Sequence, residues 1–203
     1  MMTRFLLIGA ALIGLLTTIV YIFWHEDLRY SQPTPLPAHY EAVAPGSTPG
    51  LPLPTNGKPT VLHFFNPECP CSRFNIDHFR ALVRRYGDEV NFIAVLQSDH
   101  EQTAQEKFAD YDLDVEAVWD AKGQWAKQCG VYATPQAVVI DTAGTLFYRG
   151  NYNQSRYCTQ PSTNYAQQAI ERLLGQGTSP MPPPLWPQTA LRAYGCQLPA
   201  NQH

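Results

Sequence analysis

The sequence predicts an α/β sandwich, in which helices flank a central mixed β-sheet, together with one N-terminal transmembrane helix. Short runs of β-branched and aromatic residues alternate with amphipathic helical patterns between residues 59 and 175. A stretch of twenty residues without a charge lies near the N-terminus. Proline and charged residues are distributed unevenly along the chain, which separates this domain from its flanks.

The uncharged stretch covers residues 5–24 (FLLIGAALIGLLTTIVYIFW). A helix of this length spans about 30 Å, the thickness of the hydrocarbon core of a bilayer. It ends in tyrosine, phenylalanine and tryptophan, which suit a membrane interface better than a cleavage site for signal peptidase. We therefore interpret residues 1–24 as a signal anchor. Such an anchor predicts a single-pass protein of the inner (cytoplasmic) membrane. Arg4 is the only basic residue before the span, and by the positive-inside rule it favours an N-terminus on the cytoplasmic side. The domain would face the periplasm or the cell exterior, where disulfides persist.

Composition divides the rest of the chain into three parts. Residues 25–58 carry seven of the 18 prolines and residues 176–203 carry six, whereas residues 59–175 carry 24 of the 31 charged residues. The first segment is interpreted as a Pro-rich linker and the last as a Pro-rich C-terminal tail. The middle segment is long enough to bury a core of its own. A net charge of −3 excludes a strongly basic nucleic-acid binder, so no nucleic-acid partner is expected.

The elements of the domain follow from the spacing of its apolar residues. Strands are predicted where β-branched and aromatic residues form short runs, at residues 60–66, 90–96, 115–119, 136–141 and 145–148. Helices are predicted where apolar or polar faces recur at helical spacing, at residues 76–86, 101–111, 121–128 and 165–174. Thr142-Ala143-Gly144 is expected to be the turn of a hairpin. The order βαβαβαββα predicts a mixed sheet.

Three motifs keep their order and spacing along this domain. They are Phe64-Phe65-x-x-x-Cys69 between a strand and a helix, Asp120-x-x-Gly123-x-x-Ala126 running into Gly130-Val131-x-x-Thr134-Pro135, and Val138-Val139-Ile140-Asp141-x-x-Gly144 leading to Tyr148-Arg149-Gly150. Together they resemble the thioredoxin-like superfamily, in particular its membrane-anchored extracytoplasmic TlpA-like domains. The resemblance covers residues 59–175. It implies a thioredoxin-like sandwich and a thiol–disulfide oxidoreductase that acts on protein thiols or disulfides without a bound cofactor.

Cys69 and Cys71 are the predicted reactive pair. Cys69 lies just before a predicted helix and Cys71 in its first turn, where unpaired backbone N–H groups stabilise a thiolate. The superfamily usually has Cys-x-x-Cys, whereas Ser72 occupies the second position here and Cys71 is one residue short. A Cys-x-Cys disulfide closes a small ring, and ring strain makes a disulfide more reducible. This favours the hypothesis that the protein oxidises or isomerises disulfides rather than reducing them, with the direction left open.

The resemblance also assigns roles outside this pair. Thr134-Pro135 matches the position of a cis-proline that binds an extended substrate peptide. His63 occupies a strand position where a buried acid commonly moves protons, which a histidine can do near neutral pH. A hydrogen-bonded core histidine is the equal alternative. The contracted spacing of the pair leaves the resolving thiol open, with Cys71 as the first choice and Cys129, six residues before Pro135, as the second.

Two cysteines lie far from this motif. Cys158 and Cys196 could pair in an oxidising compartment and tie the C-terminal tail to the domain, as a structural disulfide. Five cysteines leave one unpaired, and the spacing does not say which.

Other functions of the same fold remain open. A copper-delivery protein would need a third ligand, which would have to be His63 or His78, because no histidine lies between His100 and His203. A peroxidase of the peroxiredoxin type would need Pro-x-x-x-Thr-x-x-Cys, which is absent before Cys69. A domain used only for binding is a third alternative. The leading hypothesis predicts no metal site, and it names a membrane electron donor or acceptor as a candidate partner.

Overall fold

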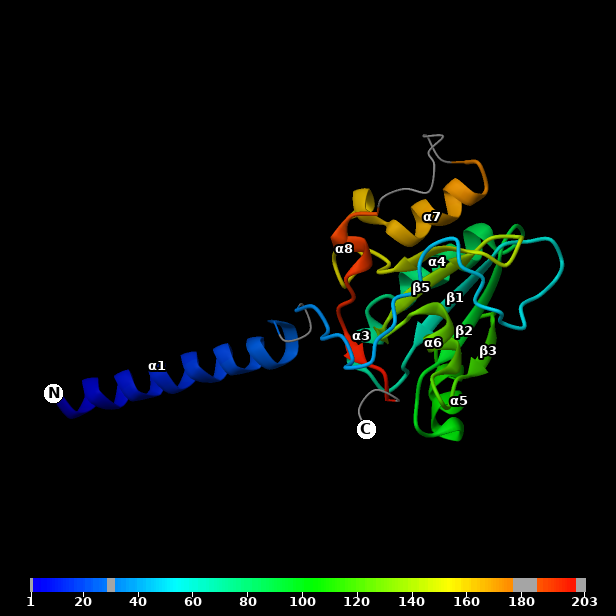
Figure 1. Cartoon of the computed structure of the whole chain (residues 1–203). Helices are drawn as coiled ribbons and strands as arrows, with labels where there is room; N and C mark the ends of the chain where they lie inside the picture. The colour runs from blue at the N-terminus through cyan, green and yellow to red at the C-terminus, as the bar shows by residue number, and fades with distance from the viewer. Residues whose placement is uncertain (1, 29–31, 177–185, 200–203) are drawn as a thin grey trace. The chain divides into compact units, whose positions relative to one another are not determined.

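The computed structural model describes residues 2–28, 32–176 and 186–199, and it contains two compact units, Met1–Gln32 and Pro33–His203 (Figure 1). The first unit consists of helix α1 (Met2–Phe23) and a short π-helical segment, η1 (Trp24–Leu28). None of the residues of α1 is buried, and the helix is long and apolar enough to cross a membrane. The predicted N-terminal apolar helix is therefore present.

The second unit is built on a five-stranded mixed sheet with the strand order β3-β2-β1-β5-β6. Strand β1 (Thr60–Phe65) is central and buried along its whole length, which explains why its sequence is apolar or aromatic at nearly every position. Strands β2 (Asn91–Leu96) and β3 (Glu116–Trp119) run parallel to it. Strands β5 (Gln136–Ile140) and β6 (Leu146–Gly150) form an antiparallel hairpin beside it. The predicted mixed sheet is confirmed.

Helices cover both faces of this sheet (Figure 1). Helices α4 (Ile76–Tyr86) and α7 (Tyr165–Leu173) bury their apolar faces in one core cluster with side chains of β1, β5 and β6. Helix α6 (Gln124–Cys129) packs in a second cluster, which contains the alternate residues of β1 and β5. Helix α5 (Glu101–Ala109) closes a third cluster at the carboxyl end of β1 and β2. This is the predicted sandwich.

Two of the sequence motifs make tight local structures. The carboxylate of Asp120 accepts hydrogen bonds from the backbone N–H groups of Trp125 (3.1 Å) and Ala126 (3.0 Å) and so satisfies the start of α6. The carboxylate of Asp141 accepts hydrogen bonds from the N–H groups of Ala143 and Thr145 in the hairpin turn. Asp120 and Asp141, which belong to the motifs shared with thioredoxin-like sequences, therefore stabilise the loops that follow β3 and β5.

The N-terminal flank differs from the expected spacer. Thr34 is buried and its N–H donates to the carbonyl of Ala193 (2.9 Å), and the hydroxyl of Tyr40 donates to the carbonyl of Gly130 (2.8 Å). Further along, three partly buried residues pack against the cluster around α6: Val43, Leu51 and Leu53. Isolated apolar side chains in a proline-rich segment have no periodicity, so composition alone did not reveal that they are core residues.

The C-terminal flank is also part of the folded unit where it is described. Trp186, Ala190, Ala193 and Leu198 are all buried. Helix α8 (Gln188–Leu191) packs against β6, and a short strand, β7 (Cys196–Gln197), pairs with β4 (Ala133–Thr134). The expected tail therefore continues the domain instead of leaving it, and residues 177–185 and 200–203 lie outside the described residues.

Candidate active site

Cys69 occupies the N-cap position of the short helix α3 (Pro70–Arg73), and a three-residue loop separates it from β1. Its backbone is extended (φ −84°, ψ 126°), and its carbonyl accepts the N–H of Ser72 (3.1 Å). Proline at the first helical position is suited to this start, because the position needs no donor. The side chain is only 5% exposed. The loop after the central strand thus holds Cys69 at the carboxyl end of the sheet.

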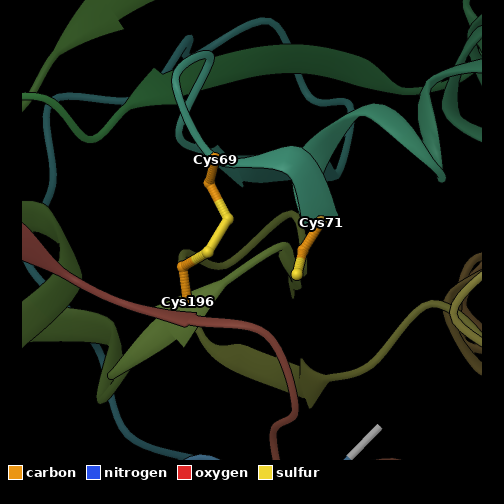
Figure 2. A group of neighbouring side chains, drawn as sticks. All are labelled: Cys69, Cys71 and Cys196. Carbon is orange, nitrogen blue, oxygen red and sulfur yellow. A yellow bond between two sulfur atoms is a disulfide. The ribbon is translucent and has the colours of Figure 1, made fainter. Parts of the chain in front are cut away.

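The sulfur of Cys69 is bonded to that of Cys196, not to that of Cys71 (Figure 2). The two Cα atoms lie 6.5 Å apart, within the range that a disulfide spans. This corrects two expectations, a disulfide within Cys-x-Cys and a structural disulfide between Cys158 and Cys196. Sequence spacing could not show that the C-terminal strand returns to the start of α3.

Cys71 is a free, buried thiol in the same group. The Sγ atoms of Cys69, Cys71 and Cys196 all lie within 4.8 Å of one another, and Figure 2 shows the Cys71 side chain on the same side of α3 as the disulfide. Burial raises the pKa of the Cys71 thiol to about 11, although the positive charge of Arg156 opposes this shift. A thiol beside a disulfide is the arrangement that thiol–disulfide exchange requires.

The other two cysteines are not in this group of sulfurs. Cys129, proposed above as an alternative resolving thiol, is completely buried at the end of α6 in the second core cluster. Cys158 is free and partly buried against the first cluster. Burial raises the pKa of each thiol to about 12. Neither cysteine is placed to resolve a bond at Cys69.

The strand edge next to Cys69 carries the predicted cis-proline. The Thr134–Pro135 peptide bond is cis, as the resemblance implied. Thr134 ends β4, and its partner across the two-stranded sheet is Cys196. The structure therefore brings Cys69, Cys71, Thr134 and Pro135 together around the same C-terminal strand.

His63 is completely buried in the middle of β1. Its ring stacks on Phe79 with 4.2 Å between ring centroids, and Nδ1 shares a hydrogen bond of 2.7 Å with the Tyr152 hydroxyl. Burial lowers the pKa of the imidazole to about 3, so the ring is neutral near pH 7. Its Nε2 has no hydrogen-bond partner among the described residues. The described contacts of His63 are thus with aromatic rings of the core.

Cys196 is the residue of the site that sequence reasoning misplaced. The glycine that precedes it, Gly195, is the available signal, because a glycine can mark a close approach of two backbones. A Cβ atom at residue 195 would collide with the carbonyl of Thr134. The reason for a glycine at this position is evident only from the structure, in which residue 195 lies against Thr134.

The mixed sheet and its flanking helices form a thioredoxin-like fold, and this fold carries a Cys-x-Cys pair at the start of α3. Residues 42–196 match the family described as Domain of unknown function (DUF6436), and the chain belongs to this family. Comparison with curated proteins finds no match. The family match begins within the N-terminal flank and ends at Cys196, so it includes part of each segment that packs onto the domain.

Solved structures share the fold at low sequence identity. An uncharacterized conserved protein from Geobacillus kaustophilus is similar with a TM-score of 0.58 and 21% identity, over 70% of this chain and 77% of that one. A hypothetical protein from Sinorhizobium meliloti is similar with a TM-score of 0.56 and 15% identity, over 71% of this chain and 80% of that one. A protein named as a thiol:disulfide interchange protein, DsbE, from Chlorobium tepidum is similar with a TM-score of 0.50 and 21% identity, over 60% of this chain and 83% of that one. These similarities establish the fold.

Proposed function

We propose that the protein is a membrane-anchored thiol–disulfide oxidoreductase that acts through Cys69 on thiols or disulfides of extracytoplasmic proteins. The observation that carries this proposal is the group of three sulfurs within 4.8 Å, in which one free thiol lies beside a disulfide. Sulfurs so arranged can exchange bonds through a mixed disulfide with no cofactor. The cis peptide bond beside them adds the feature that the resemblance associates with binding of an extended client segment.

The proposed location follows from α1. Residues 5–24 would anchor the chain in the inner membrane, and the domain would face the periplasm or the cell exterior, where a disulfide persists. A membrane electron donor or acceptor is the corresponding partner. The oxidising direction rested on a strained Cys69–Cys71 ring, and the structure forms a different disulfide. We therefore propose exchange chemistry in general, and a redox titration against glutathione would measure its direction.

His63 remains a proposed proton carrier for this reaction. Two observations support this role: His63 is buried in the strand that leads to Cys69, and its Nε2 atom has no hydrogen-bond partner among the described residues. A His63→Ala variant with an unchanged pH dependence of thiol exchange would reject this role. Thr134 and Pro135 remain the proposed substrate-binding pair.

The central test uses the reduced full chain in detergent with oxidised glutathione. We expect the wild type to take up glutathione at Cys69 and to form an internal disulfide, and we expect Cys69→Ser to lose both reactions. Cys158→Ser is the matched control, because that thiol lies outside the sulfur group. The proposal fails if the wild type forms neither the glutathione adduct nor the internal disulfide. It also fails if Cys69→Ser reacts as the wild type does.

A second candidate function is copper delivery, and one observation favours it. Three cysteine sulfurs in one group suit Cu(I), which prefers soft thiolate ligands. The third ligand would be Cys196 instead of the histidines expected from the sequence. Titration of the reduced chain with Cu(I), followed by gel filtration, would show whether copper stays bound and whether Cys196→Ser abolishes this.

A further inference from the structure

The strand that carries Cys196 is docked on the edge of the cis-proline segment. Cys196 pairs with Thr134, and Gln197 pairs with Ala133, in the antiparallel sheet β4–β7. The hydroxyl of Thr34 donates to the carbonyl of Gly195 (3.1 Å) on one side of Cys196, and Leu198 is 2% exposed on the other. Backbone pairing and the burial of Leu198 therefore help to hold Cys196 at the edge of the cis-proline segment, where its sulfur reaches Cys69.

Gly195 shows that this docking is specific. Its φ of +130° is disfavoured for residues with a side chain, and a Cβ there would meet the carbonyl of Thr134 and the ring of Pro135. The backbone of residue 195 can approach the cis-proline segment only because it has no side chain. A glycine next to Cys196 therefore allows the strand to pack closely enough for Cys196 to pair with Thr134.

Cys196 and Cys71 are the two thiols that can complete a reaction begun at Cys69. Both sulfurs lie in the group, yet the disulfide is formed with Cys196. Cys71 is 4% exposed on the first turn of α3, whereas Cys196 is half-buried on a short strand at the edge of the fold. A thiol on such a strand can move toward a mixed disulfide and away from it with little rearrangement of the core.

We propose that Cys196 is the resolving thiol of Cys69, an inference that rests on the proposed function. The Cys69 thiolate attacks a client disulfide, one client sulfur bonds to Cys69, and the other leaves as a thiolate that takes up a proton. The Cys196 thiolate then attacks Sγ of Cys69. The bond between Cys69 and its client sulfur breaks, and that sulfur leaves and takes up the proton that Cys196 lost. The Cys69–Cys196 disulfide forms, and the client has gained two electrons. The reverse sequence oxidises a client dithiol.

The test compares single-cysteine variants of the full chain in detergent, fully reduced and then mixed with oxidised glutathione. Peptide mapping after acid quenching follows the adduct at Cys69. In Cys196→Ser we expect loss of the resolving step, so that glutathione remains on Cys69. In Cys71→Ser the adduct is still expected to be resolved, with the Cys69–Cys196 disulfide as the product. Cys158→Ser is the control for removal of a thiol outside the group.

Several results would overturn this inference while leaving the proposed function intact. One is an adduct that persists in Cys71→Ser and is resolved in Cys196→Ser, because Cys71 would then be the resolving thiol. Another is a Cys196→Ser variant with a lower thermal midpoint and unchanged glutathione kinetics, because Cys196 would then be only structural. The wild type gives a test that does not depend on the folding of any variant. If the glutathione adduct on wild-type Cys69 is followed by a Cys69–Cys71 disulfide, the inference is also rejected. A wild type that forms no adduct rejects the proposed function itself.

Discussion

Cys196 lies directly opposite Thr134 in the β4–β7 sheet, so the chain's own C-terminal strand covers the edge beside the cis peptide bond. Thr134 and Pro135, the proposed substrate-binding pair, lie on this edge. Backbone groups of Thr134 that pair with β7 are not available to another strand at the same time. A client and the C-terminal strand would therefore compete for one edge, and the Cys69–Cys196 disulfide favours the strand.

Gly195→Ala is expected to weaken the docking of this strand. The alanine would combine an unfavourable φ with a collision against Thr134, and such backbone strain costs about 1–3 kcal/mol. Urea unfolding of the oxidised chain should show this loss in the free energy of unfolding. Gly46→Ala is the matched control, because Gly46 also has a positive φ but has open space around it. Equal losses in the two variants would contradict a close approach at residue 195.

Alkylation of Cys71 in the oxidised protein should be slow at neutral pH and should accelerate as the pH rises. Burial raises the pKa of this thiol to about 11, so about one molecule in 10⁴ carries the thiolate at pH 7. The rate with iodoacetamide should increase about tenfold for each pH unit up to that pKa. Peptide mapping separates Cys71 from Cys129 and Cys158, and unfolded protein gives the unshifted reference. A plateau near pH 8 would show that the folded site does not raise this pKa.

The sequence was sufficient to predict the sheet and most helices, because local patterns determine them. The run from Thr60 was expected to end at Asn66 and ends at Phe65, and the helix expected from Glu101 to Tyr111 ends at Ala109. Such differences arise where helices and strands fray, and apolar spacing does not define the last residue. The cis bond before Pro135 was also predictable, since motifs on both sides fixed its place.

The disulfide and the packing of both flanks could not be predicted in the same way. Cys69 and Cys196 are 127 residues apart, and no periodicity relates them. Trp186 illustrates the difficulty on the flank. It lies in a proline-rich segment and yet is 9% exposed, with its ring 4.7 Å from that of Tyr148 and below the guanidinium of Arg172. Contacts of this kind depend on partner surfaces that exist only after the sheet has formed.

His63 should make stability depend on pH in the acidic range. Its pKa is lowered to about 3 in the folded protein from an ordinary 6.5, so between these values only the unfolded chain takes up the proton. The free energy of unfolding should therefore fall as the pH falls from 6.5 toward 3, by up to about 1.4 kcal/mol per pH unit from this group. His63→Phe keeps a ring on Phe79 and should flatten this dependence in urea titrations.

His39→Gln is the control for the His63 experiment, because it removes an exposed histidine and leaves the core intact. If His63→Phe has the slope of the wild type, His63 is protonated in the folded state in this range. A histidine protonated in this way would be better placed to carry protons for the cysteines than the neutral ring of this structure.

Asp120→Ala should destabilise the loop between β3 and α6. The carboxylate accepts three hydrogen bonds, from the N–H groups of Trp125 and Ala126 and from the side-chain amide of Gln97 (2.8 Å). Loss of such a cap with buried donors left unpaired costs about 1–3 kcal/mol. Asp77→Ala is the control, since that side chain is 95% exposed and forms a surface ion pair with Arg80. Denaturant unfolding of both variants gives the comparison, and similar losses would show that the Asp120 cap contributes little.

Reduction of the Cys69–Cys196 disulfide should loosen the last strand without loosening the helix before it. The pairing of β7 with β4 involves only two residues on each strand, whereas α8 is held by the completely buried Ala190 and by Trp186 in the core. Hydrogen exchange should therefore rise at residues 195–197 on reduction, while α8 keeps its protection. Cys196→Ser should show the reduced pattern under oxidising conditions as well. Protection of β7 that does not change on reduction would mean that backbone pairing alone holds the strand, and a client would then have to displace it without help from thiol exchange.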